Sequence, residues 1–233
     1  MIQNVKMAPP LRPAQYVENI LVTAILDGTY PTGAALPSER SLAEQIGVTR
    51  PTVRETLQRL AKEGWVKIHH GKSTVVNNYW QQGGLSLLST LAKYGEYLPN
   101  GFVDHLLEVR ATLVPTVARL AAVHHPQAIL DYLRRARKIP QEAWAYGDYD
   151  WQLQMQMAKY SDNPIFPLIL NDFASIFGAM ALRYFSQKKA RQASQSYYRE
   201  LTGALTRSAQ AVEVVAKQAM EQSIVIWQAI KSI

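Results

Sequence analysis

The chain has no cysteine among its 233 residues, which excludes disulfide bonds and thiolate metal ligands. It also has few histidines, and all five lie before residue 126. They are His69, His70, His105, His124 and His125. Neither a Gly-x-Ser-x-Gly elbow nor a His-Glu-x-x-His pair occurs in the sequence. These absences leave an enzyme with little support.

Long apolar runs are scarce as well. By sequence, no stretch approaches the roughly 18 to 20 apolar residues of a membrane span, and the first fifteen residues hold two basic residues and three prolines. We therefore expect a soluble, cytoplasmic protein with no membrane partner. The 48% apolar composition is ample for a buried core. A net charge of +7 makes a polyanionic partner plausible.

The pattern of the chain changes near residue 80. Before it, helical periodicity gives way to a short β-like stretch; after it, helical patterns follow one another with short Pro, Gly and Asn breaks. We predict a mainly α protein of two domains. Residues 1–80 form a mixed domain with a small β hairpin, and residues 81–233 form an all-helical bundle of about seven helices.

Gly71-Lys72-Ser73 matches the last three letters of a nucleotide-binding phosphate loop. The full motif needs another glycine five residues earlier, and that position is Val66. A β-favouring Ser-Thr-Val-Val run follows Lys72, whereas the phosphate loop leads into a helix. The nucleotide loop is therefore rejected, and Lys72 needs another explanation.

The first domain has helix-turn-helix spacing. An apolar stripe from Tyr16 to Ile25 predicts a first helix. Ser38 can cap a second helix that Gly47 ends, and Thr49 can cap a third helix with Pro51 in its first turn. Two helices thus meet across a short glycine turn, as in DNA-binding helix-turn-helix proteins.

The third helix would present polar side chains from its N-terminal half, where a recognition helix meets base edges. These are Arg50, Thr52 and Arg54, and arginine can bond O6 and N7 of guanine together. Two β-like stretches, 66–69 and 73–76, flank Lys72 and predict a hairpin, or wing. Lys72 is then expected to meet a DNA phosphate. The alternative, that the arginines only solubilise the helix, is the weaker one.

The same residues carry a resemblance. The string LPSERSLAEQIGVTRPTVRETLQRLAKEGWV resembles the winged-helix domain of the GntR family of bacterial transcription regulators. The strings GKSTVVNNYW and SDNPIFPLIL are similar to the fatty-acid-metabolism regulators of that family. Pro51 replaces the threonine typical of those regulators, and no base contact is assigned to it. The resemblance implies DNA contacts from Arg40, Thr49, Arg50, Thr52, Arg54, His70, Gly71 and Lys72.

The resemblance also bears on metal binding. Many relatives hold a divalent metal in the helical domain with one aspartate and three histidines. Here Asp150 lies near the expected aspartate, but Gln154 takes the place of the first histidine and no histidine follows. Imidazole is a preferred ligand for such metals, so we predict no metal site. Asp150 is interpreted as a cap or surface residue.

The resemblance implies a long-chain fatty acyl-CoA as the effector ligand instead, with no cofactor. The matching positions are Arg110, Tyr184, Met220, Ser223 and Trp227, and the last three fall on one helix face. From the residues alone, such a stripe is more often an ordinary core, and Arg110 is more often a buried ion-pair partner. Ala219-Met220 replaces a Tyr-Gly pair, which puts the chain-length preference in doubt.

The prediction is a homodimeric regulator, repressor or activator, of fatty-acid degradation and synthesis genes. It binds a palindromic double-stranded DNA operator and is released by long-chain acyl-CoA. Alternatives are a GntR-type regulator that responds to a different small metabolite without a metal, an architectural DNA-binding protein, and an enzyme with an accessory DNA-binding domain. The basic run 134–138 is interpreted as a solvated helix surface rather than a second nucleic-acid patch.

Overall fold

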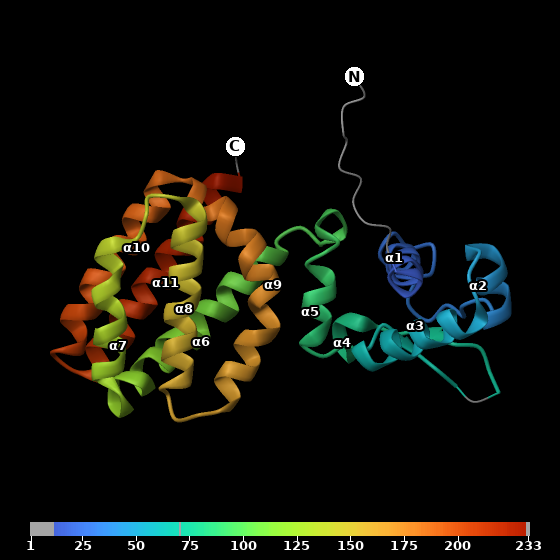
Figure 1. The fold of residues 1–233 in the computed structure, drawn as a ribbon, viewed down its shortest axis with the longest axis horizontal. Helices are drawn as coiled ribbons and strands as arrows, with labels where there is room; N and C mark the ends of the chain where they lie inside the picture. The colour runs from blue at the N-terminus through green and yellow to red at the C-terminus, as the bar shows by residue number, and fades with distance from the viewer. Residues whose placement is uncertain (1–11, 70, 232–233) are drawn as a thin grey trace, which may run out of the picture. The chain divides into compact units, whose positions relative to one another are not determined.

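The computed structural model describes residues 12–69 and 71–231, so His70 lies outside the described residues. By internal contacts the chain divides into two compact units, Met1–Tyr97 and Leu98–Ile233, and each is described by itself (Figure 1). The fold is mainly helical with one small hairpin, which confirms the predicted fold class. The boundary at residue 80 comes from the sequence pattern and stays a prediction.

The first unit holds three longer helices, a hairpin and short helical turns. Its elements are α1 Pro13–Leu26, α2 Glu39–Ile46, α3 Arg50–Glu63, β1 Val66–Lys67, β2 Val75–Val76, α4 Tyr79–Gln82, α5 Ser86–Leu91 and a 3-10 turn at Gly95–Tyr97. Tyr16 of the predicted α1 stripe is exposed, because the buried face turns toward Val17, Leu21 and Val22 instead.

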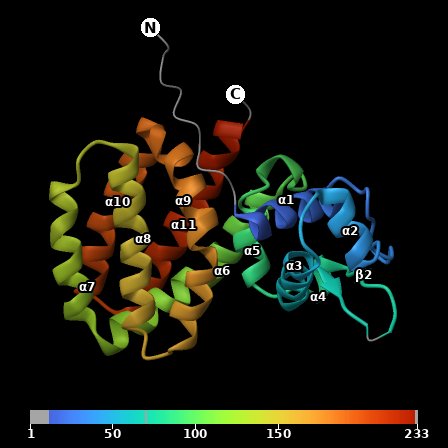
Figure 2. The same ribbon diagram turned by 45° about the vertical axis from the view of Figure 1, so that its right-hand side comes forward.

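The helix-turn-helix forms from the predicted caps. The Ser38 hydroxyl accepts a hydrogen bond from the Ser41 N–H at 3.2 Å, and Gly47 ends α2 with a φ of 76°. Val53, Leu57 and Leu60 of α3 are fully or almost fully buried. Figure 2 shows α2, α3 and the hairpin gathered in this unit. The buried face of α3 leaves its opposite face free for a partner.

The hairpin is shorter than the sequence predicted. β1 and β2 are two residues each and pair antiparallel, with Val66 opposite Val76. Just before the hairpin, the backbone at Gly64 lies close to the backbone at Gly83. Gly64 ends α3 at a φ of 92°, and a Cβ atom at this position would lie 2.7 Å from the Cα of Gly83. Only glycine fits this position, because it tolerates both the positive φ and the contact.

The second unit consists of helices. They are α6 Phe102–His124, α7 Pro126–Leu133, the 3-10 helix η2 Arg134–Lys138, α8 Ala143–Lys159, α9 Ile165–Ser186, α10 Lys188–Leu205 and α11 Ala209–Lys231. With α5, seven α-helices follow residue 81 in the described chain, as predicted. α8 and α9 lie side by side in both views, joined by a short turn (Figures 1 and 2).

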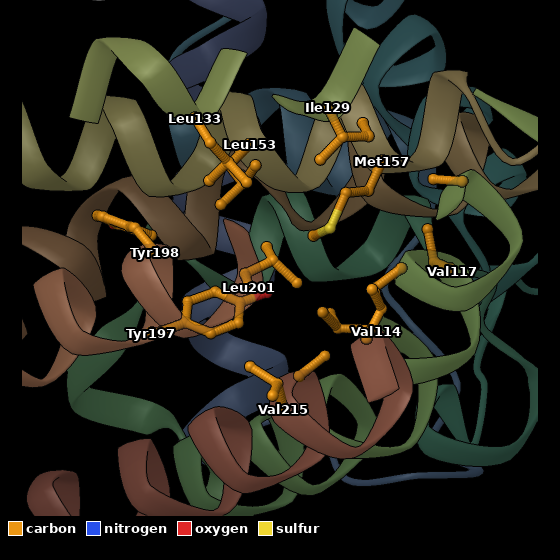
Figure 3. Close-up of a cluster of buried hydrophobic side chains, with 14 of the residues drawn as sticks. Val114, Val117, Ile129, Leu133, Leu153, Met157, Tyr197, Tyr198, Leu201 and Val215 are labelled. Atoms are coloured by element: carbon orange, nitrogen blue, oxygen red, sulfur yellow. The ribbon is translucent and has the colours of Figure 1, made fainter. Parts of the chain in front are cut away.

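The core of this unit gathers side chains from α6, α7, α8, α10 and α11, including Val114, Leu153, Leu201 and Val215 (Figure 3). Leu153 and Leu201 are fully buried. Each such aliphatic side chain contributes about 1.5–3 kcal/mol by leaving water. This core fixes the helices whose other faces line the cavities described below.

Helix α9 differs from its neighbours in its exposure. It is long and apolar enough to cross a membrane by length and composition, with a mean hydropathy of 1.7 over 18 residues, which corrects the expectation that no stretch approaches that length. Only 11% of that window is buried in the described residues, and Ile165, Leu168 and Leu182 are exposed. α9 therefore packs on the bundle through a narrow strip that includes Ile176, Ala181 and Phe185.

Candidate nucleic-acid interface and effector cavity

The exposed N-terminal half of α3 presents the predicted base-reading residues. Arg50 begins the helix and is exposed, and no carboxylate of the described residues lies within 4.0 Å of it. Its guanidinium is therefore available to a partner. Thr49 caps α3 directly before Arg50. This cap fixes the first turn of the helix, so the side chain of Arg50 projects from a defined backbone position.

Arg54 and Arg40 are held by carboxylates of α2. Arg54 forms a two-pronged pair with Glu39, whose shortest distance is 2.7 Å from Nη2 to Oε2. This pairing raises the pKa of Arg54. Arg40 pairs with Glu44 at 2.9 Å, and both side chains are largely exposed. Arg54 keeps Nη1 free of these bonds, so it can still donate to another acceptor while Glu39 orients it.

Thr49 and Thr52 use their hydroxyls at the helix start. The two Oγ1 atoms lie 2.8 Å apart, and Thr49 Oγ1 also accepts from the Thr52 N–H at 3.4 Å. Each hydroxyl retains bonding capacity, since it has one donor and two lone pairs. Their first structural role is the cap, and a DNA contact from either one remains a prediction.

The wing carries the remaining predicted residues. Gly71 and Lys72 are exposed, and the Lys72 N–H donates to the His69 carbonyl at 3.4 Å across the turn. Gly71 adopts a φ of 70°, which favours glycine. Lys72 thus stands at the tip of the hairpin, where a flexible ammonium suits a phosphate better than a base edge.

We predict that Glu39→Gln raises affinity for non-specific DNA roughly fivefold, because it removes one negative charge near the phosphates. The repulsion of a solvated charge pair is about 1 kcal/mol, which corresponds to that factor. Glu39→Gln should also lower discrimination between operator and mismatched DNA, since Gln offers Arg54 a single neutral acceptor oxygen in place of the carboxylate that orients it. Fluorescence anisotropy with both DNAs measures this. Glu44→Gln is the matched control, because it releases Arg40 and should leave discrimination unchanged. Equal loss of discrimination in the two variants would contradict the role of Glu39.

In the second unit, one cavity of about 70 Å³ brings together all five residues predicted for the ligand. They are Arg110 of α6, Tyr184 of α9, and Met220, Ser223 and Trp227 of α11. Its wall is mostly apolar and includes Phe177, Met180 and Phe185. The structure thus groups residues that lie up to 117 positions apart in the chain. Their role toward a ligand remains a prediction.

Arg110 is the centre of a buried polar network. Its Nη2 pairs with Asp150 at 2.9 Å, its Nε donates to Gln154 at 3.1 Å, and its Nη1 donates to Ser223 at 3.3 Å. Asp150 also accepts from Gln154 at 2.8 Å and from the Tyr198 hydroxyl at 3.2 Å. The interpretation of Asp150 as a cap or surface residue is wrong, because it is 3% exposed within α8. Buried charges need such partners.

Two polar atoms in the wall of this cavity are buried without a hydrogen-bond partner in the described residues: the Tyr197 hydroxyl and the Trp227 Nε1. A buried donor without a partner costs about 1–3 kcal/mol, so a polar group entering the cavity would relieve that cost. Burial raises the pKa of Tyr184 to about 12, and its hydroxyl stays protonated at neutral pH. The cavity therefore offers neutral donors beside an apolar wall.

A second cavity of about 80 Å³ adjoins the same helices. It shares Val103, Leu107, Arg110, Phe177 and Met180 with the first, so these side chains separate the two spaces. Nearly all of its wall is apolar. Both spaces are small for a long-chain ligand, since pockets for small molecules are typically about 300–1,000 Å³. A long chain therefore needs more room than either space provides.

Gln154 and Arg110 occupy the region where the resemblance implied a metal. The guanidinium lies between Asp150 and Gln154, so a positive charge already balances the aspartate. No cluster of three or more potential metal ligands occurs within residues 12–69 and 71–231. The donor set, one carboxylate and one amide, does not fit a divalent transition metal.

We therefore predict that purified protein holds no stoichiometric zinc, nickel or manganese, and that chelators leave its melting temperature unchanged, because no ligand is removed from the native state. Elemental analysis and thermal denaturation with EDTA measure this. One bound transition metal per chain would overturn the prediction.

The sequence analysis did not single out Tyr197 or Tyr198, although Tyr197 lines the cavity and the Tyr198 hydroxyl bonds to Asp150. Their side chains point to different faces of α10, since consecutive helical residues lie about 100° apart. The available signal was the polar pair at i and i+4, Asp150 and Gln154, on a helix that is otherwise buried there. A polar pair in a buried stretch needs hydrogen-bond partners, and it therefore indicates a network with donors such as tyrosine and arginine.

Comparisons with known proteins cover nearly the whole chain. Residues 13–76 match the bacterial regulatory proteins of the gntR family, and residues 77–233 match the FadR C-terminal domain. A fatty acid metabolism regulator protein of Shewanella pealeana is 38% identical over 223 residues, 94% of this chain and 92% of that protein. One from Shewanella denitrificans is 41% identical over 192 residues, 81% of this chain and 79% of that protein.

Similarity of fold extends to a solved structure of Lar, described as controlling the expression of the Listeria monocytogenes agr system. It has a TM-score of 0.56 and 14% identity, and covers 95% of this chain and 99% of that one. At this identity the likeness concerns the fold alone.

Proposed function

Since the chain belongs to the gntR family of bacterial regulatory proteins, with a FadR-type C-terminal domain, and is a regulator of fatty-acid metabolism, we propose that it acts as a homodimer on a palindromic operator and is released by long-chain fatty acyl-CoA. The family indicates a transcription regulator rather than an enzyme. The genes would be those of fatty-acid degradation and synthesis, repressed or activated in the cytoplasm.

The DNA-binding half of the proposal is supported by α3 and the wing. α3 exposes Arg50 and Arg54 near its N-terminus, where recognition helices meet base edges, and the hairpin exposes Lys72. Arg40, Thr49, Thr52 and Gly71 are the further proposed contacts, all in the same unit. One winged helix covers a half-site, so a two-fold dimer matches a palindromic operator.

The proposed response to acyl-CoA rests on one observation. A single cavity is lined by Arg110, Tyr184, Met220, Ser223 and Trp227. A fatty acyl thioester joins an apolar chain to polar acceptors. The apolar walls suit the chain, and the unpartnered donors of Tyr197 and Trp227 suit carbonyl oxygens. Arg110 supplies a cation at the same place, although Asp150 already holds it.

The small size of the two cavities supports a change of shape on binding. Pockets for small ligands are typically about 300–1,000 Å³, against about 70 and 80 Å³ here. Little of α9 is buried, so a shift of this helix would disturb few buried side chains of its own. A ligand that binds only an expanded helical unit would shift the population toward it, and a hundredfold loss of operator affinity needs about 2.7 kcal/mol of coupling.

A different small metabolite is the second candidate. Met220 is 3% exposed and fills space in the cavity wall next to Ala219, so the space available to an acyl chain depends on how these two residues yield. Met is flexible and adapts to irregular neighbours. A shorter or bulkier apolar ligand without a metal would use the same walls.

Tryptophan fluorescence tests whether acyl-CoA enters this cavity. Long-chain acyl-CoA should change the emission of the full chain, whereas free CoA should not, because Trp227 is in the cavity wall. Trp227→Phe should remove most of the change. Trp144→Phe is the matched control, since Trp144 is 62% exposed and does not line the cavity. The assignment would be contradicted if acyl-CoA changed the emission of Trp227→Phe as much as that of wild type, or if it changed the emission of no variant.

A further inference from the structure

A separate groove of about 800 Å³ lies between η2 and α10, and it is about ten times larger than either cavity described above. Gln195, Tyr198 and Arg199 of α10 line it, whereas Ser194 and Tyr197 line the effector cavity. These two sets face different sides of one helix. The groove and the proposed acyl site thus lie on different sides of α10, and the Tyr198 hydroxyl of the groove bonds to Asp150 of the cavity wall.

The groove is strongly basic. Arg134, Arg137 and Arg199 line it, and no Asp or Glu is among its described lining residues. Within the described chain, no carboxylate lies within 4.0 Å of Arg137 or Arg199. Arg134 pairs with Asp131 at 2.6 Å, but both side chains are more than half exposed and such pairs contribute little. A concave surface of one sign concentrates potential and attracts anions.

The floor of the groove is held in place by buried tyrosines. Gln141 donates to the Tyr146 hydroxyl at 3.0 Å, and Gln195 donates to the same oxygen. Tyr146 is fully buried, and the Tyr198 hydroxyl bonds to buried Asp150. Ser196 accepts a hydrogen bond from Arg199 Nη2 at 3.0 Å. The groove is therefore preformed, and a ligand would not have to order it.

We propose that this groove binds a phosphorylated small metabolite, with Arg137 and Arg199 contacting its phosphates. The planar fork of arginine matches phosphate oxygens, and the half-buried Ile139 in the wall offers apolar surface to the organic part. The volume is within the range of small-molecule sites. The basic run 134–138 then contributes a binding wall rather than only a solvated surface. This proposal does not depend on the acyl-CoA assignment, because no described residue lines both sites.

Isothermal titration of the full chain with inorganic pyrophosphate, and separately with ADP, tests the proposal in the absence of DNA. Wild type should bind, and Arg137→Gln with Arg199→Gln should bind roughly a hundredfold more weakly, at about tenfold per charged hydrogen-bond partner lost. Arg135→Gln is the matched control: it lies in the same turn against Tyr132, outside the groove lining, and should stay within about twofold of wild type.

Three results would overturn the proposal. The first is that wild type binds neither probe. The second is that the double variant and Arg135→Gln bind the probes with equal affinity. The third is that the double variant loses operator affinity while keeping pyrophosphate affinity, which would make the groove a DNA contact. If the double variant does not fold, Arg137→Lys with Arg199→Lys replaces it. That pair keeps the charge but loses the bidentate geometry, and should still bind more weakly than wild type.

Discussion

Replacing Arg110 with alanine is expected to lower the free energy of unfolding by about 3–5 kcal/mol, because it leaves the carboxylate of Asp150 buried without its cation. Asp150 is 3% exposed and Arg110 contacts it at 2.9 Å. Urea denaturation measures the loss. Under conditions where the variant is folded, it should bind operator normally and respond poorly to acyl-CoA, since the change affects the cavity and no proposed DNA contact.

Arg119→Ala is the matched control for this variant. Arg119 also lies on α6 and pairs with Glu213 at 3.3 Å, but both side chains are about a third exposed. Its loss should cost no more than about 1 kcal/mol and leave the response intact. A second variant, Arg110→Ala with Asp150→Asn, should recover part of the stability, because it removes the unpaired charge. Equal destabilisation by Arg119→Ala and Arg110→Ala would contradict the account of the buried network.

Alanine at Arg50 or Arg54 is expected to cost roughly 1–3 kcal/mol of operator affinity and to relax sequence preference, because a bidentate contact to guanine is lost. Lys72→Ala should instead weaken binding to all sequences alike and lower the salt slope by about one per subunit, because it removes one phosphate contact. Titrations of operator and mismatched DNA at several salt concentrations separate the two effects. The same loss of discrimination from all three variants would refute this division.

The helix-turn-helix was predictable because its signals are local. Ser38, Gly47 and Thr49 each act on backbone groups within a few residues, and the structure uses all three at the ends of α2 and α3. The length of the wing was not predictable from the β-favouring runs. Strand extent depends on pairing across the turn, and only Val66 with Val76 and Lys67 with Val75 are paired.

The buried network was beyond local reasoning for a related reason. Asp150 meets an arginine 40 positions away and a tyrosine 48 positions away. Sequence distance carries no record of such contacts. Helical spacing alone puts Met220, Ser223 and Trp227 on one helix face, and all three line the same cavity. The exposure of α9 was missed because apolar composition by itself indicates burial.

The most direct test of the central claim is a titration of operator DNA with the dimeric protein in the presence of acyl-CoA of increasing chain length. Each buried methylene contributes about 0.8 kcal/mol, so a few methylenes buried in only one state supply the coupling needed. We expect long-chain acyl-CoA to reduce operator affinity about a hundredfold, at about 2.7 kcal/mol of coupling, and short-chain acyl-CoA and free CoA to do little. Operator affinity that is indifferent to acyl-CoA of every length, in protein that is folded and dimeric, would contradict the account.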